Sequence, residues 1–447
     1  MASVRRKPLA VLGAGIVLLL AACVLWGLGA PRRDRFIEAI HRRGYPASPA
    51  ELEAWYLPVP AAENVALAYT NAIARLTDSG PITNFTSKSW LPPIGQGLSA
   101  DEISDLKAAL AEYHETLRLV YAVPASGRSR YPIRLVDGPA TQLPHLFKIK
   151  QASCLLSAEG LLHATEGDPE RATQAFLAAG RLTESVSEEP TIISQLVRYA
   201  DWAILLPRLE RALSLTRFTD AQLASLQELI AAAERPKSAL RGIVGDRAID
   251  MSVFTDHKTA LDALTETRGS AGNPQRFLTS GGLTLLRVTG LLEKDEAYFC
   301  DYMGKQVAAL ELPYPERFAA CQQASRMTNT PGHMLVFSSL LLPALGRYFS
   351  READHVALVR VAVTALGVER FRLAHTNALP GALAQLVPSC CPTLPSDPID
   401  GKPLHYKTHG ASYAVYGVGN DGQDDGGVAW DSNFIKIPQD VGFVVKH

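Results

Sequence analysis

Several patterns that commonly carry catalysis or cofactor binding can be checked directly in this sequence. The segment 417–422, GVGNDG, has the spacing of a dinucleotide-binding glycine loop. Such a loop must open a helix that receives the pyrophosphate, whereas here an aspartate-rich stretch follows, and its charge would repel phosphate. His114-Glu115 lacks the second histidine of a zinc-protease helix, and the chain has no Gly-x-Ser-x-Gly and no Cys-x-x-Cys. These patterns therefore predict no catalytic centre.

The remaining titratable candidates are scattered histidines and one group of glutamates. The histidines of the body that could approach one another are His145, His163, His257, His333, His355 and His375. Their spacing does not predict a shared site, so we interpret each as a surface residue or a hydrogen-bonded core residue. Glu184, Glu188 and Glu189 lie near a predicted helix end. We interpret them as a solvated face rather than as paired carboxylates for acid–base catalysis.

The six cysteines are too few for a disulfide-dense scaffold. In an oxidising compartment Cys300 and Cys321 are the candidate disulfide, which would stabilise the fold by about 3 kcal/mol. Cys390 and Cys391 are adjacent, and a disulfide between neighbouring residues is strained. Cys154 stands in an apolar helical context and is predicted to be buried and unreactive.

Composition sets the class of protein. The 447 residues are enough for two or three domains at roughly 100–200 residues each. Hydrophobic residues make up 47% and charged residues 20% of the chain, which supports a packed core and excludes global disorder. The net charge of −1 provides no basic field to gather nucleic acid, so we exclude that partner class.

The N-terminus predicts a membrane segment. Residues 8–30, PLAVLGAGIVLLLAACVLWGLGA, are uncharged and have basic residues on both sides. A helix of this length spans about 34 Å, enough to cross the hydrocarbon core of a bilayer. The two flanks carry equal positive charge, so the positive-inside rule does not orient the segment.

A second signal in the same segment gives the orientation. The residues Leu20-Ala21-Ala22-Cys23 resemble the lipobox of bacterial lipoprotein signal peptides, which implies a lipidated Cys23 at the mature N-terminus. The apolar run continues after Cys23, which favours an uncleaved anchor instead. Both alternatives stay open, and both predict an extracytoplasmic body in the bacterial cell envelope.

Beyond the anchor, the pattern is helical. Ser48 with Glu51, Ser99 with Glu102, and Thr219 with Gln222 are predicted helix-capping pairs. From about 140 to 256 apolar residues recur at helical spacing. A long helix is expected over about 351–375.

The segment 151–184 is predicted to be a helix pair. It resembles one tetratricopeptide repeat through Gly160, Gly167-Asp168, Ala172, Phe176 and Ala179. In this comparison small residues let the two helices approach, and Phe176 fills the space between them. A solenoid needs about three stacked repeats, and one match is present. An ordinary helical hairpin and a repeat with a concave binding face are both open.

The most specific pattern lies near the C-terminus. Residues 394–427, LPSDPIDGKPLHYKTHGASYAVYGVGNDGQDDGG, are followed by short strand candidates at 434–437 and 441–445. This stretch resembles the C-terminal part of the major pseudopilin of type II secretion systems. The N-terminus lacks the pilin signature and the chain is much longer than a pseudopilin. The resemblance therefore implies a shared module over about 350–447, and the full layout resembles a group of bacterial envelope proteins.

The same resemblance implies a calcium loop. Asp421, Asp424 and Asp425 match the family's acidic loop by position, and Asp431 matches it more loosely. Ca²⁺ binds six to eight oxygen ligands, which closely spaced carboxylates and turn carbonyls can supply. The alternative is a pair of tight turns chosen for their tolerance of positive φ.

Together these observations predict a mainly α protein with three parts: an anchor or lipoprotein signal at 1–31, an α-helical domain at 32–349, and a long helix with a small β module at 350–447. The expected function is a membrane-tethered interaction or scaffold protein that binds a protein partner without catalysis. The alternative is an envelope hydrolase whose site is assembled from distant residues.

Overall fold

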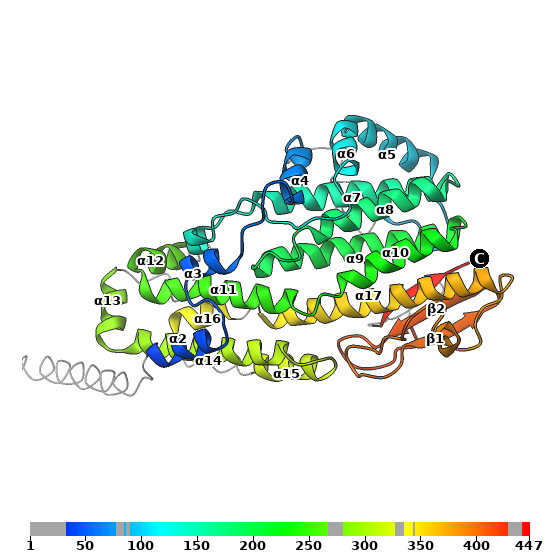
Figure 1. The fold of residues 1–447 in the computed structure, drawn as a ribbon. Helices are drawn as coiled ribbons and strands as arrows, with labels where there is room; N and C mark the ends of the chain where they lie inside the picture. Colours follow the sequence, from blue (N-terminus) through cyan, green and yellow to red (C-terminus); the bar gives the residue numbers. More distant parts are fainter. Residues whose placement is uncertain are drawn as a thin grey trace, which may run out of the picture.

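The computed structural model describes residues 33–76, 85, 90–266, 280–326, 335–342, 345–427 and 440–447. These residues form a mainly helical body with one small sheet near the C-terminus (Figure 1), so the predicted fold class is confirmed at this level. The predicted membrane segment lies outside the described residues. Within the described ones, no helix combines the length and apolar character needed to cross a bilayer.

The first half of the body consists of short helices followed by four longer ones. The short ones are α2 (Arg33–Arg42), α3 (Pro49–Trp55), α4 (Val65–Ile73), α5 (Ala100–Glu112), α6 (His114–Tyr121) and the 3₁₀ helix η3 (Leu135–Ala140). The longer ones are α7 (Pro144–Thr165), α8 (Pro169–Glu184), α9 (Ile192–Leu215) and α10 (Asp220–Ala233).

The second half continues with helices and ends in the sheet. Its helices are α11 (Ser238–Thr255), α12 (His257–Glu266), α13 (Ser280–Val288), α14 (Leu291–Leu310), α15 (Glu316–Arg326), α16 (Val336–Leu341), α17 (Leu345–Ala374) and the 3₁₀ helix η7 (Leu383–Leu386). The strands β1 (His405–His409), β2 (Ser412–Gly417) and β3 (Val441–Val445) form an antiparallel sheet in the order β1-β2-β3.

The helix α17 connects the helical body with the sheet. It packs against α9 and α10, and also against α15, β2 and β3. In Figure 1, α9 and α10 lie above α17, whereas α15 and the sheet lie below it. Val361, Ala362 and Leu366 of α17 share one hydrophobic core with Leu209 of α9 and Tyr413 of β2. The predicted boundary between residues 349 and 350 therefore falls inside one helix. Tyr348 and Phe349 belong to a second hydrophobic cluster, whereas α17 from Val359 onwards shares its core with helices of the body.

Side chains of α9 form hydrogen bonds with the backbone at β3, a strand at one edge of the sheet. The backbone N–H of Val444 in β3 donates to Glu210 Oε1 at 2.6 Å, and the N–H of Lys446 donates to Ser214 Oγ at 3.1 Å. On the inner face, the hydroxyl of Tyr413 donates to the carbonyl of Ala365 at 3.0 Å. These bonds satisfy an edge strand that would otherwise expose unpaired backbone groups.

Local signals in the sequence identify several of these elements correctly. Ser99 and Thr219 form complete capping boxes at α5 and α10. At α3, Ser48 caps the helix, but the Glu51 carboxylate accepts from the backbone N–H of Ala47. The predicted helix pair over 151–184 is confirmed as α7 and α8.

Close packing of α7 against α8 depends on a glycine, Gly160, which has no side chain. A Cβ at Gly160 in α7 would stand 2.9 Å from the ring of Phe176 in α8, so the ring occupies the space that glycine leaves. The helices α9 and α10 then pack against the same pair. The resemblance to a tetratricopeptide repeat itself stays a prediction.

One acidic side chain lies in the helical core without a partner. Asp201 of α9 is 1% exposed, and neither of its carboxylate oxygens has a hydrogen-bond partner in the described structure. Burial raises the pKa of Asp201 to about 8, and the charge of Lys150 opposes this only in part. The folded protein therefore holds this carboxyl protonated at neutral pH, while the unfolded chain ionises it above about pH 4.

We predict that Asp201→Asn removes a pH dependence of stability. Because the folded pKa is raised, wild-type protein loses stability as pH rises from the unfolded pKa to the folded one, at about 1.4 kcal/mol per pH unit. The neutral amide does not titrate. Urea unfolding of both proteins between about pH 5 and pH 7 should therefore show the variant gaining on wild type as pH rises. A difference that does not change with pH would contradict the raised pKa.

Candidate functional site

A cleft of about 860 Å³ opens between the end of α3, the loop at 124–129, the C-terminal end of α8, and α10 with the segment that follows it. Its aromatic and apolar lining includes Trp55, Tyr56, Leu57, Val65, Tyr69 and Leu229. Its charged lining consists of Arg128, Arg181, Arg235 and Arg241 with Glu184 and Glu188. This volume is in the range of ligand-binding pockets.

The wall between α8 and α9 is fixed by α11. A Cβ at Gly245 in α11 would stand 1.7 Å from the carbonyl oxygen of Pro190, so only glycine lets the two backbones approach this closely. In addition, the N–H of Ile192 donates to Asp246 Oδ1 at 3.1 Å. The turn that carries Ser185 and Glu188 is therefore held from behind by α11.

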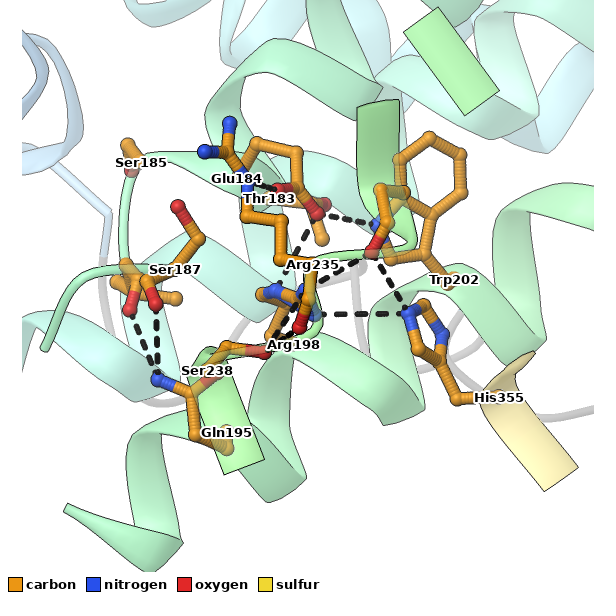
Figure 2. A network of polar contacts seen from close by, with 12 residues as sticks. Thr183, Glu184, Ser185, Ser187, Gln195, Arg198, Trp202, Arg235, Ser238 and His355 are labelled. Carbon is orange, nitrogen blue, oxygen red and sulfur yellow. Dashed lines mark hydrogen bonds and ion pairs between the residues drawn. The ribbon is translucent and has the colours of Figure 1, made fainter. Parts of the chain in front are cut away.

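Glu184 forms the centre of the polar network in this wall (Figure 2). Trp202 Nε1 donates to Glu184 Oε1 at 2.8 Å, and Arg198 Nε lies 3.3 Å from the same oxygen. Arg235 Nε donates to Glu184 Oε2 at 2.7 Å. The Glu184 side chain is 8% exposed and that of Arg198 is 0% exposed. Two guanidinium groups thus neutralise one buried carboxylate.

Arg198 extends this network towards α17. One of its terminal nitrogens donates to the carbonyl of Ala233 at 3.0 Å. His355 Nε2 lies 3.2 Å from the same carbonyl and is the ring nitrogen that can donate to it. Burial, and then the charge of Arg198, lower the pKa of His355 to about 3. His355 is therefore neutral, as a hydrogen-bonded core histidine.

Glu184, Glu188 and Glu189 have three different environments. Glu188 is 46% exposed and pairs with Arg241 at 2.8 Å. Glu189 is fully buried, with His145 Nε2 2.9 Å away and the Ser194 hydroxyl donating to it. The interpretation as one solvated face is therefore wrong for Glu184 and Glu189, because tertiary partners distant in sequence bury them.

The arginines of the cleft are the residues that sequence reasoning missed. Arg128 and Arg181 line the cleft, and in the described part of the chain neither forms an ion pair with a carboxylate. No motif surrounds them, so only their tertiary position marks them. Beside Arg181, burial raises the pKa of Tyr69 to about 12, and the charge of Arg181 acts in the opposite direction.

Two aspartates of the predicted calcium loop, Asp421 and Asp424, serve as turn caps. Asp421 Oδ1 accepts from the N–H of Gln423 at 3.1 Å, and Asp424 Oδ1 accepts from the N–H of Gly426 at 2.9 Å. The bond from Gly426 lowers the pKa of Asp424. Across the described ranges, no group of three or more acidic, histidine or cysteine side chains could hold a metal ion. Asp425 belongs to no such group, and Asp431 lies outside the described residues.

The predicted disulfide is not formed in this structure. Cys300 of α14 and Cys321 of α15 are both buried free thiols. The two thiols have different charged neighbours. The charges of Glu296 and Arg247 affect the pKa of Cys300, whereas those of Glu352 and Arg317 affect the pKa of Cys321.

The other cysteines have different outcomes. Cys154 is buried as predicted, and burial raises the pKa of its thiol to about 12. Its thiol is therefore protonated and a poor nucleophile. Cys23, the predicted lipidation site, lies outside the described residues.

We predict that Glu184→Ala destabilises the protein far more than Glu188→Ala. The first change leaves the guanidinium of Arg198 buried without a carboxylate, which should cost about 3 kcal/mol. The second removes a half-exposed pair, which is expected to cost less than about 1 kcal/mol. Urea unfolding followed by circular dichroism measures both. Equal losses in the two variants would show that the buried network is not a structural anchor.

Comparisons with protein-family models, curated proteins and solved structures found no match to this chain. The interpretation of the cleft therefore depends on its own residues. These are four arginines, two carboxylates that already have partners, and an aromatic and apolar wall.

Proposed function

We propose that this protein is a membrane-tethered, extracytoplasmic interaction protein that binds a segment of a protein partner in the cleft, without catalysis. The observation that carries the proposal is the construction of the cleft. Its wall is braced by the Glu184 network, while its opening presents exposed apolar and charged side chains, including Leu57 at 64% exposure. A rigid wall with an accessible lining suits binding, because little ordering is needed when a ligand enters.

The lining itself favours binding over catalysis. No histidine belongs to the described lining of the cleft, and Glu184 accepts hydrogen bonds from Trp202 and Arg235 and forms an ion pair with Arg198. General acid–base catalysis needs a group that is free to exchange a proton with a substrate. The carboxylate with the most central position in the wall is not such a group.

The tether is the other half of the proposal. It rests on the uncharged segment 8–30, which precedes the first described helix, α2. Arg33 at the start of α2 pairs with Glu296 of α14 at 3.0 Å. An anchor in this segment would therefore be joined closely to the body, and the cleft would stay at a limited distance from the bilayer.

The alternative, an envelope hydrolase, has one set of residues in its favour. A neighbouring hollow of about 540 Å³ contains Tyr121, Glu159 and His163. The Tyr121 hydroxyl donates to Glu159 at 2.6 Å, and His163 Nε2 lies 3.8 Å from the same carboxylate. A histidine and a carboxylate thus approach each other, but the carboxylate is already hydrogen-bonded.

We predict that a photo-crosslinker placed at Ala232 captures a discrete partner in the native envelope. Ala232 lines the cleft and is exposed. Ala221 is an exposed residue of the same helix that does not line the cleft, so it is the matched control. Expression of full-length protein with p-benzoylphenylalanine at either position, followed by irradiation and mass spectrometry, gives the comparison. A defined product at Ala232 alone supports the proposal, whereas no product at Ala232, or the same product at both positions, contradicts it.

A further inference from the structure

We infer that the segment held in the cleft is acidic, and that Arg181 together with Tyr69 forms the subsite for one of its carboxylates. This inference rests on the proposed binding role and adds the chemistry of the ligand. Three observations carry it: the charge balance of the lining, the unpartnered polar groups at one end, and the apolar wall beside them.

The charge balance leaves positive charge without a partner. Of the lining side chains, four are arginines and two are glutamates. Glu184 is shared by Arg235 and the buried Arg198, and Glu188 pairs with Arg241. The protein's own carboxylates are therefore occupied.

Two arginines remain for a ligand. In the described part of the chain, neither Arg128 nor Arg181 has a carboxylate partner. Arg128 is exposed at the cleft and Arg181 is half-buried in it. A guanidinium presents paired donors that match a carboxylate in geometry as well as in charge.

A tyrosine beside Arg181 supplies the second, independent observation. Tyr69 is 3% exposed, and its hydroxyl makes no hydrogen bond within the described residues. Both Tyr69 and Arg181 line the cleft and also the neighbouring hollow, so they stand where the two join. The Tyr69 hydroxyl and the Arg181 guanidinium are both hydrogen-bond donors, and a ligand oxygen placed between them would accept from both.

Part of the cleft's lining is apolar and aromatic. Trp55 lies under the guanidinium of Arg241, with 5.3 Å from the guanidinium carbon to the ring centroid. Leu57, Val65 and Leu229 continue this wall. The occupant should therefore carry apolar side chains as well as carboxylates, which a short peptide segment provides and inorganic phosphate does not. A volume of about 860 Å³ admits such a segment but no folded domain.

The test uses the full-length protein in detergent and a short, fluorescently labelled peptide that alternates glutamate with leucine. Anisotropy should show binding that weakens as salt is raised. The same peptide with lysine in place of glutamate should bind at least about tenfold more weakly, and millimolar inorganic phosphate should not displace the acidic peptide. Equal binding of the two peptides, or displacement by phosphate, would overturn the assignment of a carboxylate-bearing ligand.

Variants locate the subsite. Arg181→Ala should weaken acidic-peptide binding about tenfold, because a charge-assisted hydrogen bond is lost, and Tyr69→Phe should weaken it severalfold. Arg217→Ala removes the same charge from an exposed position outside the cleft and should leave binding within about twofold of wild type. Thermal melts check that each variant is folded. Arg181→Ala binding as tightly as Arg217→Ala would overturn the subsite.

The two proposals fail separately. Crosslinking from Ala232 does not depend on the charge of the occupant. If the crosslinked product persists in the Arg181→Ala background while the acidic peptide fails to bind wild type, the ligand class is wrong and the binding role stands.

Discussion

The architecture around the cleft depends on one buried carboxylate, that of Glu184. It joins the end of α8 to Arg198 and Trp202 on α9 and to Arg235 after α10. Removing charged groups from water is costly unless each finds partners of good geometry. Here the carboxylate accepts from Trp202 and Arg235 and forms an ion pair with Arg198. Arg198 in turn donates to the backbone and to Ser238. The network therefore fixes three elements in one arrangement.

The same network determines what the cleft offers to a ligand. Because Glu184 and Glu188 are engaged by Arg198, Arg235 and Arg241, the lining has no carboxylate left for Arg181. Contrast this with Asp201, a buried carboxyl that has no partner and is held protonated. Glu184 thus stays ionised because it is paired, whereas Asp201 is protonated. Of these two residues, only Glu184 organises the wall of the cleft.

How far the sequence predicted this structure depends on the range of each interaction. The caps at Ser99 and Thr219, and the packing of Gly160 on Phe176, depend on residues close in sequence or on a repeating pattern, so they could be predicted. The pairing of Glu184 with Arg235 joins residues 51 positions apart, and no local pattern signals it. The boundary predicted at residue 350 falls inside α17 for a related reason: the helix begins at Leu345, and only tertiary contacts show that its later part shares a core with α9.

The measurement that tests this account most directly is a double-mutant cycle between Glu184 and Arg198. Unfolding free energies of full-length wild type, Glu184→Gln, Arg198→Met and the double variant isolate the interaction between the two side chains. If the buried pair anchors the wall of the cleft, the coupling energy should be about 2 kcal/mol and stabilising. A coupling energy close to zero would show that the two charges are merely neighbours and that the wall is held by packing alone.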